Sequence, residues 1–199
     1  MGSSIASPQK PVIVVTGPSG AGKGTLIHRL LELVPELEPT VSMTTRAQRP
    51  GEVDGREYHF RSDREFIDLD GAGGFLEWVT YVSGHRYGTP RSELDRIAAE
   101  GRVPVLELET EGALRVKQAV PGAVTIFISA PVAELERRLR ERATESAGEI
   151  GERMELARRQ LAQAGEFDHV VENDSVERAA GELEEIVRGV LDRAATMRP

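Results

Sequence analysis

The chain has 199 residues, of which 39% are hydrophobic, and a formal net charge of −8 at pH 7. A chain of this size can bury one sizeable core. The acidic excess argues against an extended binding surface for nucleic acid or for an anionic membrane, because both are negatively charged. The chain lacks cysteine, which excludes disulfides, a thiolate nucleophile and a Cys-ligated zinc site.

Residues 1–10, MGSSIASPQK, have no apolar stretch of the kind found in signal peptides, and we expect them to form a disordered tail. No apolar run in the sequence approaches the roughly 20 residues that a membrane-spanning helix needs. The lack of cysteine also fits a reducing compartment. These features predict a cytoplasmic protein that has neither a membrane nor a nucleic acid as its partner.

The first predicted element is a strand at Val12–Thr16, and the glycine-rich segment GPSGAGKGT follows it directly. Glycines allow consecutive backbone N–H groups to converge on an anion. Apolar residues at helical spacing after the loop place a helix N-terminus beneath the same anion. A glycine-rich turn without a ligand is the alternative, but the flanking strand and helix favour a phosphate-binding loop. Its residues are Gly17, Pro18, Ser19, Gly20, Ala21, Gly22, Lys23, Gly24 and Thr25.

The loop departs from the usual phosphate-binding pattern at one position. Gly24 stands where a Ser or Thr normally follows the lysine and contacts magnesium, and Thr25 comes one residue later. This departure weakens the direct contact with the metal. We therefore assign no side chain as a direct metal ligand.

Residues 40–90 show short strand patterns, in the order TVSMTT, EYHF and FLEWVTYV. Ser62 and Glu65 form the sequence signature of a capping box, which predicts the start of a short helix between the second and third of these strands. The change of pattern predicts a lobe inserted into the main body.

Further along the chain, apolar runs at Val103–Glu109, Ala123–Ser129 and His169–Glu172 alternate with helical patterns, and we expect a final helix at about Val176–Ala195. This alternation predicts a parallel sheet covered by helices. The highly charged segment 131–166 is typical of two helices, joined here by a mobile tip at Thr144–Gly148.

Together the elements predict an α/β fold in which a P-loop parallel sheet, flanked by helices, carries an inserted lobe and a helical lid. The predicted divisions are a core at 11–39, 91–130 and 167–199, an inserted lobe at 40–90 and a lid at 131–166.

Four blocks of the sequence resemble guanylate kinases and occur in the order found in that family. They are TVSMTTRAQRPGEVDGREYHF at 40–60, FLEWVTYVSGHRYGTPRSEL at 75–94, LELETEGA at 106–113, and RLRERATES with the following Arg153. The resemblance covers about Val12 to Leu191. It implies an ATP:GMP phosphotransferase that uses Mg²⁺ and gives ADP and GDP, with residues 40–90 as the GMP-binding lobe.

A candidate acceptor-phosphate site lies in the first block. Arg46 and Arg49 are three residues apart in a loop rich in proline and glycine, and two guanidinium groups with the Tyr58 hydroxyl can grip one dianionic phosphate. Two solvated loop arginines are the alternative. The resemblance implies that this is the site for the GMP phosphate and that Tyr87 completes it.

Glu77 is the candidate for reading the base. Strand alternation can turn its carboxylate into a pocket, where it would accept hydrogen bonds from guanine N1–H and the N2 amino group. Adenine presents an acceptor at N1 and would be repelled. Taken alone, Glu77 would be an exposed strand carboxylate. The resemblance implies further base contacts from Ser42, Thr89 and Glu109.

The segment LELETEG departs from the family, which more often carries a D-x-D-x-Q-G pattern. Glu107, Glu109 and Glu111 stand here instead. By resemblance, Glu107 reaches a magnesium-bound water and Glu109 reaches guanine, and no role follows for Glu111. The resemblance also implies that Asn173 contacts the adenine of ATP.

The arginines of the predicted lid have two interpretations. A charged helix face is usually just solvated. Phosphoryl transfer, however, needs its developing negative charge stabilised and water excluded, and arginines on a closing lid do both. No general base is needed, because the acceptor is already an anionic oxygen. The resemblance implies the catalytic set Lys23, Arg46, Arg138, Arg142 and Arg153.

Two other functions remain open from the sequence. One is a P-loop kinase for a different small phosphate acceptor, because the GKGT ending is shared with such enzymes. The other is a non-catalytic guanylate-kinase-like module that binds proteins. Such modules tend to lose the loop lysine or the lid arginines, which are retained here. The sequence therefore favours catalysis, with ATP and GMP as the small-molecule partners.

Overall fold

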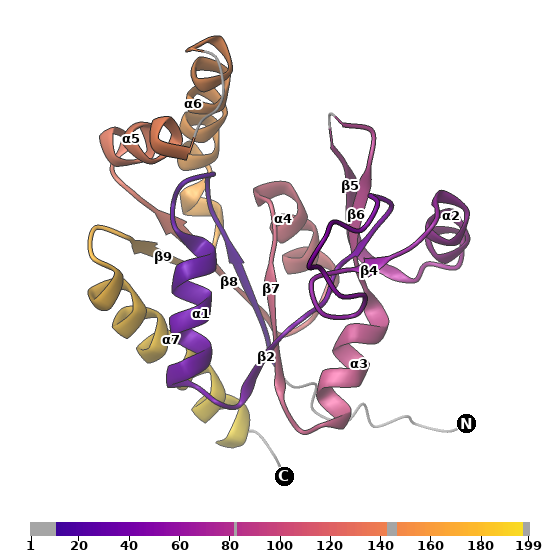
Figure 1. Ribbon diagram of the computed structural model, residues 1–199. Helices are drawn as coiled ribbons and strands as arrows, with labels where there is room; N and C mark the ends of the chain where they lie inside the picture. Colours follow the sequence, from indigo (N-terminus) through magenta and orange to yellow (C-terminus); the bar gives the residue numbers. More distant parts are fainter. Residues whose placement is uncertain (1–10, 82, 143–146, 197–199) are drawn as a thin grey trace.

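A five-stranded parallel sheet lies at the centre of the molecule (Figure 1). The computed structural model describes residues 11–81, 83–142 and 147–196, so the predicted tail at 1–10 lies outside the described residues. The strand order is β2-β7-β1-β8-β9. The strands are β1 (Val12–Thr16), β2 (Leu37–Pro39), β7 (Val103–Glu107), β8 (Ala123–Ser129) and β9 (His169–Glu172). This sheet confirms the predicted α/β fold.

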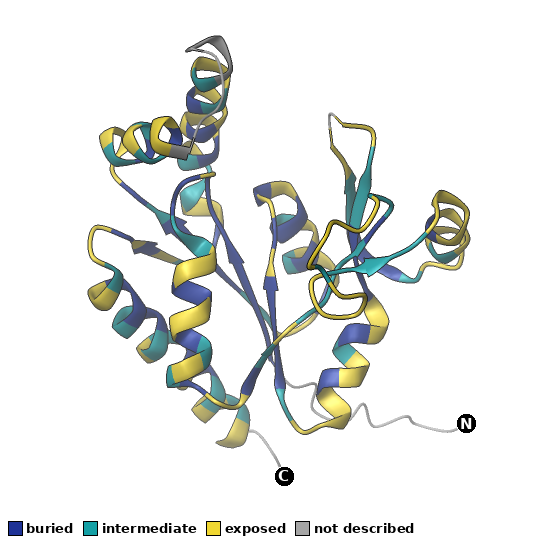
Figure 2. Cartoon of the chain, viewed as in Figure 1, coloured by how far each residue is buried: buried dark blue, intermediate teal, exposed yellow. Residues whose placement is uncertain are grey.

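Helices cover both faces of this sheet, as the alternation of strands and helices predicts. On one face, α1 (Lys23–Leu33) and α7 (Val176–Thr196) pack on strand residues such as Ile13 and Ile126. On the other face, α4 (Thr110–Ala119) packs on Val14 and its neighbours. All five residues of β1 are buried, which explains their continuous apolar character (Figure 2).

A second, four-stranded sheet of order β4-β3-β6-β5 stands beside the first. Its strands are β3 (Met43–Thr44), β4 (His59–Phe60), β5 (Phe75–Thr80) and β6 (Arg86–Pro90), all within the segment predicted as an inserted lobe. Helix α2 (Asp63–Gly71) packs on it through Phe66, whose ring stacks on Phe75 with centroids 4.4 Å apart. The division of the chain into a core, this lobe and a lid stays a prediction.

The local signals at the start of α2 are confirmed in detail. The Ser62 side chain accepts from the backbone N–H of Glu65, and the Glu65 carboxylate accepts from the Ser62 backbone N–H at 2.8 Å. This reciprocal capping box satisfies two backbone donors that the first helical turn leaves without partners.

The predicted lid contains two helices, α5 (Val132–Arg142) and α6 (Ala147–Ala162), followed by a short 3₁₀ turn at Ala164–Glu166. They rise above the end of β1 where the phosphate loop begins (Figure 1). The expected tip at Thr144–Gly148 lies largely outside the described residues. None of the helices in the described part of the chain is both long and apolar enough to cross a membrane.

The sequence prediction was wrong at the ends of several strands and missed three elements. The patterns TVSMTT and FLEWVTYV extend beyond β3 and β5. β7 ends at Glu107 rather than at Glu109, because the chain turns there into α4 and Glu109 takes the N-cap position, its carbonyl accepting from Ala113 N–H at 2.9 Å. The missed elements are β2, β6 and α3 (Arg91–Ala99). Two are short strands without clear alternation, and β6 runs through Pro90 into α3.

We expect Leu30→Ala to destabilise the fold by about 2–5 kcal/mol, because Leu30 is fully buried between α1 and the sheet and its truncation leaves a cavity. Leu156→Ala is the matched control, since Leu156 is 47% exposed. The free energy of unfolding is measured by urea titration. Equal losses for the two variants would contradict the placement of the core.

Candidate active site

The phosphate loop connects the central strand β1 to α1. Gly17, Gly20 and Gly22 have φ angles of 142°, 88° and 87°, which side-chain-bearing residues rarely adopt. A Cβ on Gly17 would lie 2.2 Å from the carbonyl oxygen of Ile128 in β8. The loop therefore packs directly on the neighbouring strand, and its curvature brings it over the first turn of α1, whose N–H groups have no partners within the helix.

Lys23 holds the two ends of this loop together. Its Nζ donates to the carbonyl oxygens of Gly17 at 2.8 Å and Pro18 at 3.3 Å. The ammonium group thus lies beside the loop backbone, where a bound phosphate chain would meet a full positive charge. A cavity of about 440 Å³ opens over the loop. It is lined by Ser19, Gly20, Gly22, Lys23, Gly24, Thr25 and Glu107.

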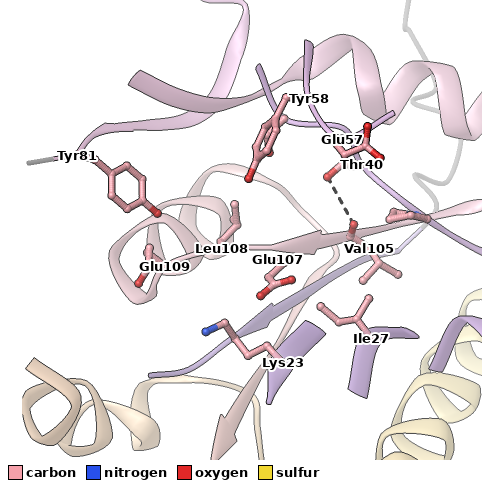
Figure 3. A pocket seen from close by; sticks show the side chains of 12 residues that line it. Lys23, Ile27, Thr40, Glu57, Tyr58, Tyr81, Val105, Glu107, Leu108 and Glu109 are labelled. Atoms are coloured by element: carbon pink, nitrogen blue, oxygen red, sulfur yellow. Dashed lines mark hydrogen bonds between the residues drawn. The ribbon is translucent and has the colours of Figure 1, made fainter. Parts of the chain in front are cut away.

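A second cavity, of about 380 Å³, extends from Lys23 toward the four-stranded sheet. Figure 3 shows Lys23 and Glu107 on the side of the phosphate loop, with Tyr58 and Tyr81 facing them from the other sheet and Glu109 beside Tyr81. Lys23 and Glu107 line both this cavity and the one over the loop. The two cavities therefore meet at these two side chains.

Glu77 lies at the inner end of the second cavity, in an adjoining space of about 100 Å³ that Ser42 and Tyr87 also line. It is 8% exposed, and its Oε1 accepts from the hydroxyl of Thr89 at 2.9 Å. Burial raises the pKa of Glu77, and the Thr89 hydrogen bond acts in the opposite direction. The result is a buried carboxylate held in one orientation, with Thr89 directed at Glu77.

Arg46 is the most constrained arginine in the four-stranded sheet region. Its Nη1 and Nη2 donate to the two carboxylate oxygens of Glu52 at 3.0 and 2.8 Å, and its guanidinium carbon lies 5.5 Å from the ring centroids of Tyr58 and Phe60. The Glu52 hydrogen bond raises the pKa of Arg46 and in return lowers that of Glu52. Arg46 is thus held as a cation in a fixed position.

Sequence reasoning missed Glu52, although it follows Arg49 closely in the same turn. The Glu52 carboxylate also accepts from the backbone N–H of Arg49 at 2.7 Å, so it fixes both the Arg46 side chain and the loop. The Arg49 side chain itself is exposed. A carboxylate three residues after an arginine in a Pro-Gly turn was the available signal.

Tyrosine rings complete this side of the site. Tyr58 meets Tyr87 edge to face with centroids 5.6 Å apart, and Tyr87 meets Tyr81 in the same way at 4.9 Å. Burial raises the pKa of Tyr81 to about 12, with the charge of Glu109 adding to the effect. Tyr81 lines both the second cavity and the adjoining space, and sequence reasoning missed it.

The two lid helices reach the phosphate loop through arginines. Arg138 donates to the carbonyl oxygen of Gly20 at 3.2 Å and to Glu134 at 2.7 Å. Arg153 donates to the hydroxyl of Ser19 at 2.9 Å. The side chain of Arg142, the third predicted lid arginine, lies outside the described residues.

Asn173 tethers the loop from the end of β9. It is 1% exposed, and its Nδ2 donates to the carbonyl oxygen of Ala21 at 2.7 Å. Its Oδ1 has no hydrogen-bond partner among the described residues. This contact gives Asn173 a structural role in holding the loop, and the adenine contact expected from the family stays a prediction.

The three glutamates at and after the end of β7 have different surroundings. Burial raises the pKa of Glu107, the Lys23 charge lowers it, and Glu109 raises it further. Glu109 accepts from the Gln160 side chain at 3.3 Å. Glu111 is exposed and lies 3.4 Å from Arg115. Within the described residues no group of three or more His, Cys, Asp or Glu side chains is arranged to hold a metal ion.

The site combines a phosphate loop at the centre of a parallel sheet with a second cation site across a shared cavity. Arginines from the two lid helices contact the loop. This arrangement is that of a P-loop phosphotransferase, which brings two phosphate-bearing ligands together. Residues 9–190 match the family model for guanylate kinase. The chain belongs to the guanylate kinase family.

Individual relatives agree with this assignment. The chain is 48% identical over 181 residues to a guanylate kinase of Rubrobacter xylanophilus, a match covering 90% of this chain and 94% of the relative. It is 46% identical over 177 residues to one of Synechococcus sp. strain JA-3-3Ab, covering 88% and 81%. The crystal structure of guanylate kinase from Anaplasma phagocytophilum superposes with a TM-score of 0.70 at 28% identity, covering 92% of this chain and 87% of the other.

We expect Gly22→Ala to lower the free energy of unfolding by about 1–3 kcal/mol, because its φ is 87° and a Cβ would lie 2.4 Å from Asn173 Nδ2. Gly24→Ala is the matched control. A Cβ there lies 4.0 Å from Glu107, and alanine in a helix stabilises by roughly 0.4–1 kcal/mol. Urea unfolding measures both, and equal stability of the two variants would contradict this loop geometry.

Proposed function

We propose that the cavity over the phosphate loop binds ATP, that the adjoining cavity binds GMP, and that the chain transfers the γ-phosphoryl group between them to give ADP and GDP. Membership of the guanylate kinase family supports this reaction. The main structural support is that Lys23 and Glu107 line both cavities. The two cavities therefore adjoin, and in-line transfer requires the donor and acceptor phosphates to approach each other.

On the donor side, the loop N–H groups from Gly17 to Thr25 and the Lys23 ammonium would hold the ATP phosphates. Arg138 and Arg153 already contact the loop and would stabilise the charge on the transferring group. The family also implies this role for Arg142. Cations placed before the reaction begins need little reorganisation during it, which favours the transition state.

On the acceptor side, Arg46, Arg49, Tyr58 and Tyr87 would hold the GMP phosphate. A guanidinium group has five N–H donors, and three of those on Arg46 bond to Ala47 and Glu52. The remaining two, on Nε and Nη2, lie on one edge of the guanidinium group, which also interacts with Tyr87, and they form a fork that suits a phosphate. Arg46 can therefore keep its contact with Glu52 while it binds GMP.

The guanine base would be read by Glu77, with Ser42, Thr89 and Glu109 as further contacts. Buried acceptors discriminate strongly, because a base without matching donors leaves the carboxylate unpaired in a site that water reaches poorly. The Thr89 hydroxyl already donates to Glu77, so in this proposal Thr89 also orients the carboxylate toward the base.

Magnesium fits the same arrangement. Mg²⁺ is commonly held by one or two carboxylates together with substrate phosphates and water, and Glu107 lies on the wall between the two cavities. When bound, the ion neutralises charge on the donor phosphates. Glu107 would hold it through a water molecule. The cytoplasmic location expected from the sequence stays a prediction.

We expect the purified protein with ATP and Mg²⁺ to release ADP far faster with GMP than with AMP, CMP or UMP, by a factor of up to about ten-thousand. A coupled assay of ADP release compares the four monophosphates. Comparable rates with AMP would refute the proposed base selection. Release of ADP with none of them would favour the non-catalytic module.

We expect Glu77→Gln to raise the KM for GMP near neutral pH, where the wild-type carboxylate is charged. Because burial raises its pKa above the ordinary 4.5, Glu77 takes up a proton as the pH falls and comes to resemble the amide. The ratio of variant to wild-type KM should therefore decrease toward one on acidification. Taking this ratio cancels the titration of the GMP phosphate itself.

The matched control for this measurement is Glu111→Gln, because Glu111 is exposed and lines neither GMP-side cavity. Its KM for GMP should equal that of the wild type. Thermal unfolding should show that Glu77→Gln is no less stable at neutral pH, since burial disfavours the charged carboxylate that it removes. A KM ratio that does not change with pH would contradict the role of Glu77.

A further inference from the structure

Glu109 occupies an unusual position at the start of α4. It is the N-cap residue of that helix, yet its side chain makes no capping hydrogen bond. The side chain instead lines the GMP-side cavity, its inner extension and a neighbouring groove of about 310 Å³. Glu109 thus forms a partition between the acceptor site and this groove.

Gln160 of α6 approaches Glu109 from the groove. It is 6% exposed, and its Nε2 donates to Oε2 of Glu109 at 3.3 Å. Gln160 lines the groove but neither of the two GMP-side spaces. It is therefore placed to act on a nucleotide through Glu109 rather than by touching it.

The same face of α6 also holds the donor loop. Arg153 and Gln160 are seven residues apart, which is two helical turns, so their side chains project from one side of the helix. Arg153 contacts Ser19 in the phosphate loop, and Gln160 contacts Glu109. Helix α6 thus touches both halves of the site at fixed spacing.

We propose that Gln160 is a positioning residue that holds the Glu109 carboxylate in place for guanine, an inference that rests on the proposed GMP site. A glutamate side chain has several rotatable bonds, and ordering it on binding costs conformational entropy. A hydrogen bond from Gln160 to Oε2 orders the side chain beforehand and leaves Oε1 for the base. A neutral amide does this without cancelling the negative charge that attracts the guanine donors.

The test is Gln160→Met, which keeps the length of the side chain but removes the amide. We expect the KM for GMP to rise about tenfold, the change that corresponds to roughly 1.4 kcal/mol, while the KM for ATP stays within twofold. The ATP measurement is essential. If Gln160 only held α6 in place, its loss would displace Arg153 as well and would raise the KM for ATP. Gln118→Met, an exposed substitution on α4, is the matched control.

A double-mutant cycle with Glu109→Ala, which removes both acceptor oxygens, decides whether Gln160 acts through Glu109. In the Glu109→Ala background, adding Gln160→Met should change the KM for GMP by less than twofold. The inference is overturned if Gln160→Met leaves the KM for GMP unchanged, raises both KM values equally, or has its full effect without Glu109. Failure of the proposed function is seen separately, because the wild-type protein would then not phosphorylate GMP.

Discussion

The contact between Gly17 and β8 is the constraint on which the site depends. Because a Cβ at Gly17 would lie 2.2 Å from the Ile128 carbonyl oxygen, the chain leaving β1 can pack this closely on β8 only with glycine at this position. This packing places the loop within reach of three separate elements. Asn173 bonds to it from the end of β9, Arg138 from α5 and Arg153 from α6. Each of these contacts requires the loop to be where the Gly17 packing puts it.

The acceptor side poses the opposite electrostatic problem, since three carboxylates surround the space proposed for one purine. The structure gives each a different partner. Thr89 orients the buried Glu77, Lys23 stabilises the charge on Glu107, and Gln160 orders Glu109. In the proposed site, charge on Glu77 and Glu109 suits a base that offers hydrogen-bond donors, while the acceptor phosphate is left to Arg46 and its neighbours. The arrangement separates attraction for the base from attraction for the phosphate.

The sequence predicted well what depends on neighbouring residues. The strand, loop and helix from Val12 to Leu33 and the capping box at Ser62 are set by spacing within a few positions, and both appear as expected. The sequence did not reveal the Glu109–Gln160 and Asn173–Ala21 pairs, which are 51 and 152 residues apart. Such pairs depend on how the sheet orders its strands, which no local pattern encodes. The Arg46–Glu52 pair is local. A carboxylate beside an expected anion site would repel the anion, so the sequence gives no reason to place Glu52 there.

The space between Glu77 and α4 is tight. A methyl group on Gly112 of α4 would lie 3.0 Å from the Glu77 carboxylate, so strand β5 of one sheet is fitted against a helix that packs on the other. A chimera that received residues 40–90 from a kinase with another nucleobase preference would therefore bring a foreign side chain against an unchanged helix. Any residue larger than glycine at position 112 would press on the side chain at position 77. Changing the preferred nucleobase by evolution or by engineering thus requires coordinated changes on both sides of this boundary.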